Sequence, residues 1–155
     1  MAVIGIDPGL SGAIALLDDG DGIDVFDMPV LELARSGKKR REIDPTRLDD
    51  LIRSLRGNRA VLEQAGSRPG QGVASSFAFG KGYGLVLGIL VAHGIPYTVV
   101  HPTVWKKALH VPAGKDAARA RASQLFPGSA QRWTRAKDDG RAEAALIALW
   151  GRRHG

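Results

Sequence analysis

Apolar runs separated by turn residues predict a small sheet in the first part of the chain. Residues 2–6 form a continuous apolar run that stops at Asp7-Pro8-Gly9, and residues 12–17 form a second run. Residues 23–28 alternate apolar and polar positions after an Asp- and Gly-rich turn. Because the connections are short, these three segments are expected to pair as antiparallel strands.

The next segment changes from polar residues to a helical pattern. Residues 35–43 are polar and basic, which predicts a mobile loop. Asp44 can cap a helix that has Pro45 in its first turn and that ends near Gly57. The apolar positions at helical spacing are Leu48, Leu51, Ile52 and Leu55.

The second half of the chain alternates helices with short strands. Strands are expected at residues 60–62, just before Glu63, and at 97–100, with a long apolar helix at 73–93 between them. Further helices are expected at 103–109, at 115–126, and from Asp138 or Asp139 to about Trp150. This order predicts one α/β domain over residues 1–155, with a mixed five-stranded sheet (three antiparallel strands, then two parallel ones) flanked by helices.

The long helix at 73–93 carries two further signals. Gly80, Gly84 and Gly88 recur every four residues; each costs about 1 kcal/mol relative to Ala, and together they let another backbone come close. Lys81 interrupts the apolar run, and the remainder is too short to span a bilayer. With no basic-then-apolar leader at the start, a cytoplasmic protein without membrane association is expected.

Composition and charge narrow the function. The chain has no cysteine, which excludes disulfides, thiol nucleophiles and cysteine-ligated metals. Its net charge is +6, but residues 1–34 hold seven acids and no base, whereas residues 60–137 hold ten bases and two acids. A basic body of this kind favours a polyanionic partner, most often nucleic acid, over a merely well-solvated surface.

Two carboxylates stand at the ends of apolar strands. Asp7 follows the first strand and Glu63 follows the fourth. Isolated acids at such places are costly unless they are paired or bind a metal. For Asp7 the alternative is a simple turn residue before Pro-Gly, whereas Glu63 has a weaker alternative because Glu disfavours strand ends and turns.

A second pair of acids lies on the last helix. Asp139 and Glu143 are four residues apart, so both carboxylates share one face, although an acidic first turn would also suit the helix dipole. Small residues around Glu143 let this helix approach the sheet and turn Glu143 toward the strand ends. Acids from three segments could thus converge on Mg²⁺ or Mn²⁺, and two such ions can hold a scissile phosphate.

The segment Gly5-Ile6-Asp7-Pro8-Gly9-Leu10-Ser11-Gly12 closely resembles the first strand and turn of the RuvC-type Holliday junction resolvases, which belong to the RNase H-like superfamily. The family pattern continues with a Glu that closes the fourth strand, here Glu63, and with two acids on the last helix. The commonest bacterial members place these two acids three apart and end in Asp. Here they are four apart and end in Glu143, which is more similar to phage-type and related branches.

The resemblance implies a catalytic and metal-binding set of Asp7, Glu63, Asp139 and Glu143, with Asp139 favoured over Asp138 because it shares a helix face with Glu143. It implies Mg²⁺ as cofactor, with Mn²⁺ as a substitute, and 5′-phosphate products. It also implies a homodimer, joined largely through the helix at 73–93, that nicks two opposed strands of a four-way DNA junction symmetrically.

Residues for DNA contact are expected outside the acidic set. The loop at 66–72 and Phe77 lie where the family approaches the branch point, so Phe77 is either a wedge between bases or a core residue. Basic candidates, for each of which a solvated helix face is the alternative, are Lys81, Lys106, Lys107, Lys115 and Arg119. Lys115 resembles the family's base nearest the metals. A non-catalytic module that binds branched DNA on the same fold is the alternative function.

Overall fold

The three N-terminal apolar segments pair as an antiparallel meander in this computed structural model, which describes residues 1–66 and 69–155. They are β1 (Val3–Asp7), β2 (Ala13–Leu17) and β3 (Ile23–Asp27). The strands β6 (Arg59–Glu63) and β7 (Tyr97–Val100) then add in parallel beside β1. The sheet order is β3-β2-β1-β6-β7, which confirms the expected mixed sheet of five strands.

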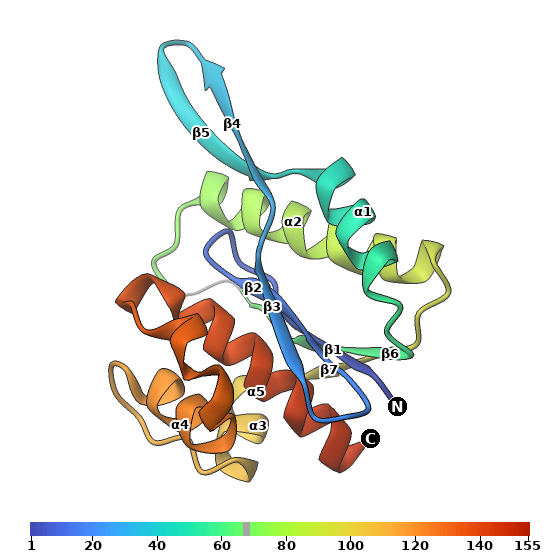
Figure 1. Ribbon diagram of the computed structural model, residues 1–155. Coiled ribbons are helices and arrows are strands. Elements are labelled where there is room, and N and C mark those ends of the chain that lie inside the picture. The colour runs from blue at the N-terminus through green and yellow to red at the C-terminus, as the bar shows by residue number, and fades with distance from the viewer. Residues whose placement is uncertain (67–68) are drawn as a thin grey trace.

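Helices cover both faces of this sheet and make three layers (Figure 1). On one face lie α1 (Pro45–Leu55) and α2 (Val73–Ala92). On the other face lie α3 (Pro102–Ala108), α4 (Ala117–Leu125) and α5 (Asp139–His154). Two short 3₁₀ turns that the sequence analysis did not predict, η1 (Pro127–Trp133) and η2 (Ala136–Asp138), lead into α5.

Alternating side chains of the central strands feed two separate cores. In β1, Ile4 and Ile6 point into the layer of α1 and α2, where they join Leu48 and Leu90. Val3 joins the opposite core, which contains α5 and two buried tryptophans, Trp105 and Trp133. Both faces of the sheet are therefore buried, as expected for an α/β layered fold.

The helix α5 lies unusually close to β1. A Cβ atom added at Gly5 would overlap the carbonyl oxygen of Ala144 and would lie 2.9 Å from the Cβ of Ala148. Only small residues on both elements allow this approach, as the alanines around Glu143 predicted. The close packing sets the beginning of α5 against the carboxyl ends of the strands.

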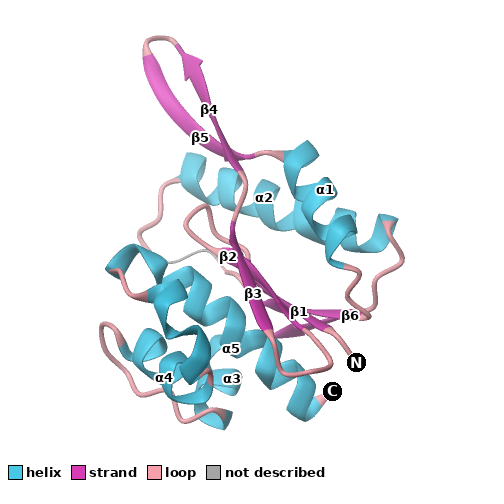
Figure 2. Ribbon diagram, viewed as in Figure 1, coloured by secondary structure: helices cyan, strands magenta, loops and turns pink. Residues whose placement is uncertain are grey.

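The expectation of a mobile loop at residues 35–43 is wrong. The chain forms a hairpin of β4 (Val30–Arg35) and β5 (Lys38–Ile43), which is not hydrogen-bonded to the main sheet and projects from the body (Figure 2). Ser36 and Gly37 both have positive φ, the requirement for a two-residue hairpin turn that matches strand twist. The hairpin escaped the sequence analysis because its strands are mostly exposed and lack a buried apolar face.

The predicted start of α1 is confirmed. The Asp44 side chain accepts a hydrogen bond of 3.1 Å from the backbone N–H of Arg47, and Pro45 occupies the first turn. The apolar residues Leu48, Ile52 and Leu55 are buried. The predicted loop at 66–72 includes residues 67 and 68, which lie outside the described part of the chain.

The long helix α2 is packed only along its C-terminal half. Val86, Ile89 and Leu90 are buried, whereas Phe77 is 74% exposed, so the alternative that Phe77 is a core residue of this chain is wrong. By length and composition alone α2 could cross a membrane even with Lys81 in it, although the run after Lys81 by itself is too short to do so. The cytoplasmic location stays a prediction.

Candidate metal centre

Three carboxylates from distant parts of the sequence meet at one edge of the sheet. Asp7 ends β1 and Glu63 ends β6, and because these strands are adjacent and parallel, both side chains emerge at the same edge. Glu143, in the second turn of α5, faces them from the helix that packs on β1. One oxygen atom from each of the three residues lies within 4.8 Å of the others. The predicted convergence is thus confirmed for these three acids.

The three carboxylates repel one another electrostatically. Burial, with repulsion from Glu143 and then Glu63, raises the pKa of Asp7 to about 7. Burial also raises the pKa of Glu63, although a hydrogen bond from Trp105 opposes that rise. A site that brings negative charge together at this cost, with oxygen ligands only, fits a hard divalent cation such as Mg²⁺ or Mn²⁺.

One cation of the protein reaches this cluster. The ammonium of Lys106 lies 3.6 Å from Oε1 of Glu143 and 5.2 Å from the ring centroid of Trp105. Among residues 1–66 and 69–155, Lys106 is the only Lys or Arg that forms an ion pair with one of the three carboxylates, which leaves the described part of the cluster short of positive charge. Lys106 was predicted to contact DNA, and its partial exposure at the rim of the cluster is compatible with that role, which stays a prediction.

A tryptophan that the sequence analysis did not place at the site is hydrogen-bonded to one of the three carboxylates. Trp105 is fully buried, and its Nε1–H donates a hydrogen bond of 2.7 Å to Oε2 of Glu63. The only sequence signal was an indole directly before Lys106 and Lys107, which a basic helix with one core residue would also produce.

The structure does not bring Asp139 into the cluster. Its Oδ1 accepts a hydrogen bond of 2.7 Å from Nε of Arg119, and its side chain is 49% exposed. Asp138, the alternative, is buried and accepts hydrogen bonds of 2.9 and 3.0 Å from the guanidinium of Arg135, which holds its pKa below the usual range. Of the two neighbours, Asp139 is thus the one whose carboxylate is accessible, and its role as a ligand stays a prediction.

The wider spacing of the final acids has a steric reason. The residue three positions before Glu143 is Gly140, and a Cβ there would lie 2.5 Å from the carbonyl oxygen of Ser11. Because the turn after β1 occupies this space, no side chain fits at that position. Asp139, directly before Gly140, is the neighbouring acid in the first turn of α5, and its role as a ligand stays a prediction.

The remaining basic candidates differ in how free they are. Lys107 and Lys115 are exposed and make no ion pair within residues 1–66 and 69–155. Lys81 lies on α2, where it pairs with Glu42 of the hairpin at 3.4 Å. The guanidinium of Arg119 is engaged inside the protein by two carboxylates and a carbonyl. Their predicted contacts with DNA stay predictions.

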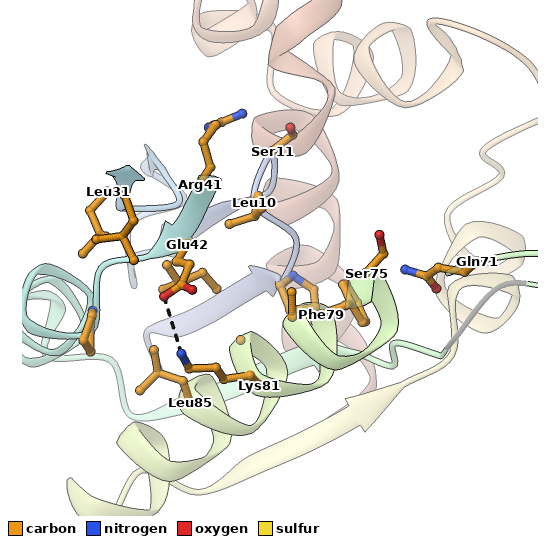
Figure 3. A pocket seen from close by; sticks show the side chains of 16 residues that line it. Leu10, Ser11, Leu31, Arg41, Glu42, Gln71, Ser75, Phe79, Lys81 and Leu85 are labelled. Carbon is orange, nitrogen blue, oxygen red and sulfur yellow. Dashed lines mark hydrogen bonds and ion pairs between the residues drawn. The ribbon is translucent and has the colours of Figure 1, made fainter. Parts of the chain in front are cut away.

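A cavity of about 820 Å³ lies between the turn after β1, the hairpin and α2 (Figure 3). The turn after β1 contributes Leu10 and Ser11 to its wall, and α2 contributes Phe79 and Lys81. None of the three clustered carboxylates lines it. Pro8, which directly follows Asp7, lines the cavity, so it starts beside the cluster without containing its carboxylates.

Comparison with known proteins identifies the fold. No family model and no curated protein matches the sequence. The structure of RuvC from T. thermophilus in complex with a Holliday junction substrate matches with a TM-score of 0.66 and 17% identity, over 100% of this chain and 96% of that one.

Two further solved structures agree. Another Thermus thermophilus RuvC structure matches with a TM-score of 0.57 and 20% identity, over 97% of this chain and 92% of that one. A yeast mitochondrial Holliday junction resolvase matches at 0.52 and 16%, over 96% and 76%. The mixed sheet, its flanking helices and these likenesses along nearly the whole chain show that this protein has the RNase H-like fold of the RuvC-type Holliday junction resolvases.

Proposed function

We propose that this protein is a Mg²⁺-dependent endonuclease that resolves four-way DNA junctions by paired, symmetric nicks as a homodimer. The observation that carries the proposal is the meeting of Asp7, Glu63 and Glu143 within 4.8 Å at the carboxyl edge of the sheet. The fold, shared with resolvases, supports it. Such a cluster is what hydrolysis of a phosphodiester with the help of divalent metals needs.

The reaction is hydrolysis of one phosphodiester bond in each of two opposed strands. The oxygen of water bonds to phosphorus, the bond to the 3′ oxygen breaks, and the leaving oxygen takes up a proton, which gives a 5′-phosphate and a 3′-hydroxyl. Asp7, Glu63 and Glu143 would hold the cation, which supplies an activated water and neutralises charge on the phosphate. Asp139 is the fourth acid of the proposal and lies one helical turn before Glu143 on α5.

The charge distribution supports a DNA substrate. Lys106 lies at the rim of the cluster, and Lys107 and Lys115 are exposed on neighbouring segments of the same helical layer. The hairpin adds Arg35, Lys38, Lys39, Arg40 and Arg41. Of these, only Lys39 has an ion pair within the described residues, at 3.9 Å from Glu32. Unpaired exposed cations of this kind are suited to contacts with backbone phosphates.

The exposed face of α2 supports a homodimer. Positions Gly80, Gly84 and Gly88 open onto empty space, and Phe77 and Val91 are exposed nearby on the same helix. An apolar helix with an open small-residue row lets a second copy approach closely. Replacing Gly84 with Arg should give a monomer in sedimentation equilibrium, whereas Gly128→Arg, at another open glycine, should leave the dimer intact. A wild-type monomer under the same conditions would contradict the dimer.

The test is cleavage of a synthetic four-way junction beside a linear duplex of the same sequences. We expect Mg²⁺-dependent nicks in the junction alone, with 5′-phosphate ends, and restored by Mn²⁺. Specific junction binding without nicks under any divalent cation would instead support the non-catalytic DNA-binding module. The complete set of acids, which such a module does not need, favours the enzyme.

A further inference from the structure

The indole of Trp105 bridges two parts of the candidate metal centre. Its Nε1–H donates to Oε2 of Glu63 at 2.7 Å, and its ring lies 5.2 Å from the ammonium of Lys106, which in turn contacts Glu143. Trp105 is itself completely buried in the core between α3 and α5. A rigid, buried donor therefore holds one carboxylate oxygen and packs against the cation at the rim.

We infer that Trp105 is a positioning residue of the metal centre, which fixes Glu63 with Oε2 engaged and Oε1 available to a divalent cation. The inference rests on the proposed function, because it concerns the same centre. Glu63 is the last residue of β6, and because it does not lie on a helix, no preceding helical turn restricts its side-chain rotamers. Hydrogen bonds to carboxylate ligands from outside the ligand set orient them, and their loss weakens metal binding.

The other two tryptophans provide matched controls. Trp133 is equally buried, but its Nε1–H donates to Oγ of Ser123 at 3.0 Å, away from the three carboxylates. Trp150 has a buried Nε1 with no hydrogen-bond partner among the described residues. Changes at Trp133 thus report the general cost of replacing a buried indole, and only a change at Trp105 removes a bond to a proposed ligand.

The experiment measures Mn²⁺ binding to the full chain by the electron paramagnetic resonance signal of free Mn²⁺. Trp105→Phe should raise the dissociation constant about ten- to hundredfold, whereas Trp133→Phe should leave it unchanged. In cleavage assays Trp105→Phe should raise the Mg²⁺ concentration for half-maximal rate, and saturating Mg²⁺ should restore much of the rate.

Two further proteins keep the result unambiguous. Glu63→Gln should abolish the binding, and if the wild type binds no Mn²⁺, the metal centre itself is overturned. If the wild type binds and Trp105→Phe binds equally well, only the positioning role is overturned. Should Trp105→Phe unfold, 3-benzothienylalanine at position 105 keeps the shape of the ring and replaces the N–H with sulfur. Normal Mn²⁺ affinity in that protein would equally refute the inference.

Discussion

Arg119 donates a hydrogen bond of 2.7 Å from Nε to Oδ1 of Asp139. The same guanidinium donates to the backbone carbonyl of Thr134 at 3.0 Å and pairs with Asp116 at the start of α4. Arg119 therefore ties the first turn of α5 to the loop that carries Lys115. One ion pair joins a residue expected to contact DNA and a residue expected to bind metal, so the two are not independent.

Replacing Asp139 with Asn tests its place in the proposed catalytic set. We expect cleavage of a four-way junction to fall by about tenfold or more, since a carboxylate beside the metal centre contributes charge that an amide lacks. Single-turnover cleavage at saturating enzyme measures this.

Asp138→Asn is the control for this prediction. Asp138 is 3% exposed and bonded to the half-exposed Arg135, so its replacement should lower the free energy of unfolding without changing Mn²⁺ affinity. Its pKa is lowered in the folded state, so this stability is present above its ordinary pKa of 3.8 and is lost as the pH falls further. Wild-type activity in Asp139→Asn would exclude Asp139 from the set.

Asp7→Asn should abolish cleavage while junction binding persists or tightens. The amide removes a ligand, yet it also removes a repelled negative charge that faces Glu63 and Glu143. Gel-shift titrations in Ca²⁺ beside cleavage assays in Mg²⁺ measure the two effects. Cleavage at the wild-type rate would contradict the assignment of the metal centre.

The raised pKa of Asp7 predicts a pH-dependent stability in the absence of metal. With a folded pKa of about 7 and an ordinary value of 3.8, the folded chain binds more protons than the unfolded chain between these limits. Stability should therefore fall as the pH rises through this window. Asp7→Asn should raise the free energy of unfolding by about 4 kcal/mol at pH 8 and should have no such effect near pH 3. Urea titrations at the two pH values provide the comparison.

Metal binding should show the opposite pH dependence. Because a protonated Asp7 cannot ligate a cation, the apparent Mn²⁺ affinity should weaken by up to about tenfold for each pH unit below 7. Raising the Mn²⁺ concentration should restore cleavage at pH 6. Cleavage whose metal requirement is the same at pH 6 and pH 8 would argue against Asp7 as a ligand.

The basic hairpin should contribute to DNA affinity through phosphates. Arg40→Ala should weaken binding to every DNA sequence and should reduce the slope of log affinity against log salt by about 1. Arg53, paired with Asp50 at 2.5 Å on α1, offers a control that removes the same charge. If Arg40→Ala and Arg53→Ala have equal salt slopes, the hairpin does not contact the substrate.

The sequence by itself determined the layered α/β fold and identified the three acids that cluster. Apolar runs mark strands because both faces of the central sheet are buried, and turn and cap residues such as Asp44 mark the ends of elements. Asp7 and Glu63 were identifiable because a carboxylate directly after a buried strand needs a physical reason.

Only the tertiary structure decided which charges meet. The hairpin of residues 30–43 is mostly exposed and β5 is largely basic, so its strands lack the buried apolar face that marked the strands of the main sheet. The hydrogen bond from Trp105 to Glu63 and the ion pair from Arg119 to Asp139 join residues 42 and 20 positions apart. Such contacts depend on how closely α5 and α3 pack against the sheet. Local patterns of hydrophobicity do not determine that packing distance.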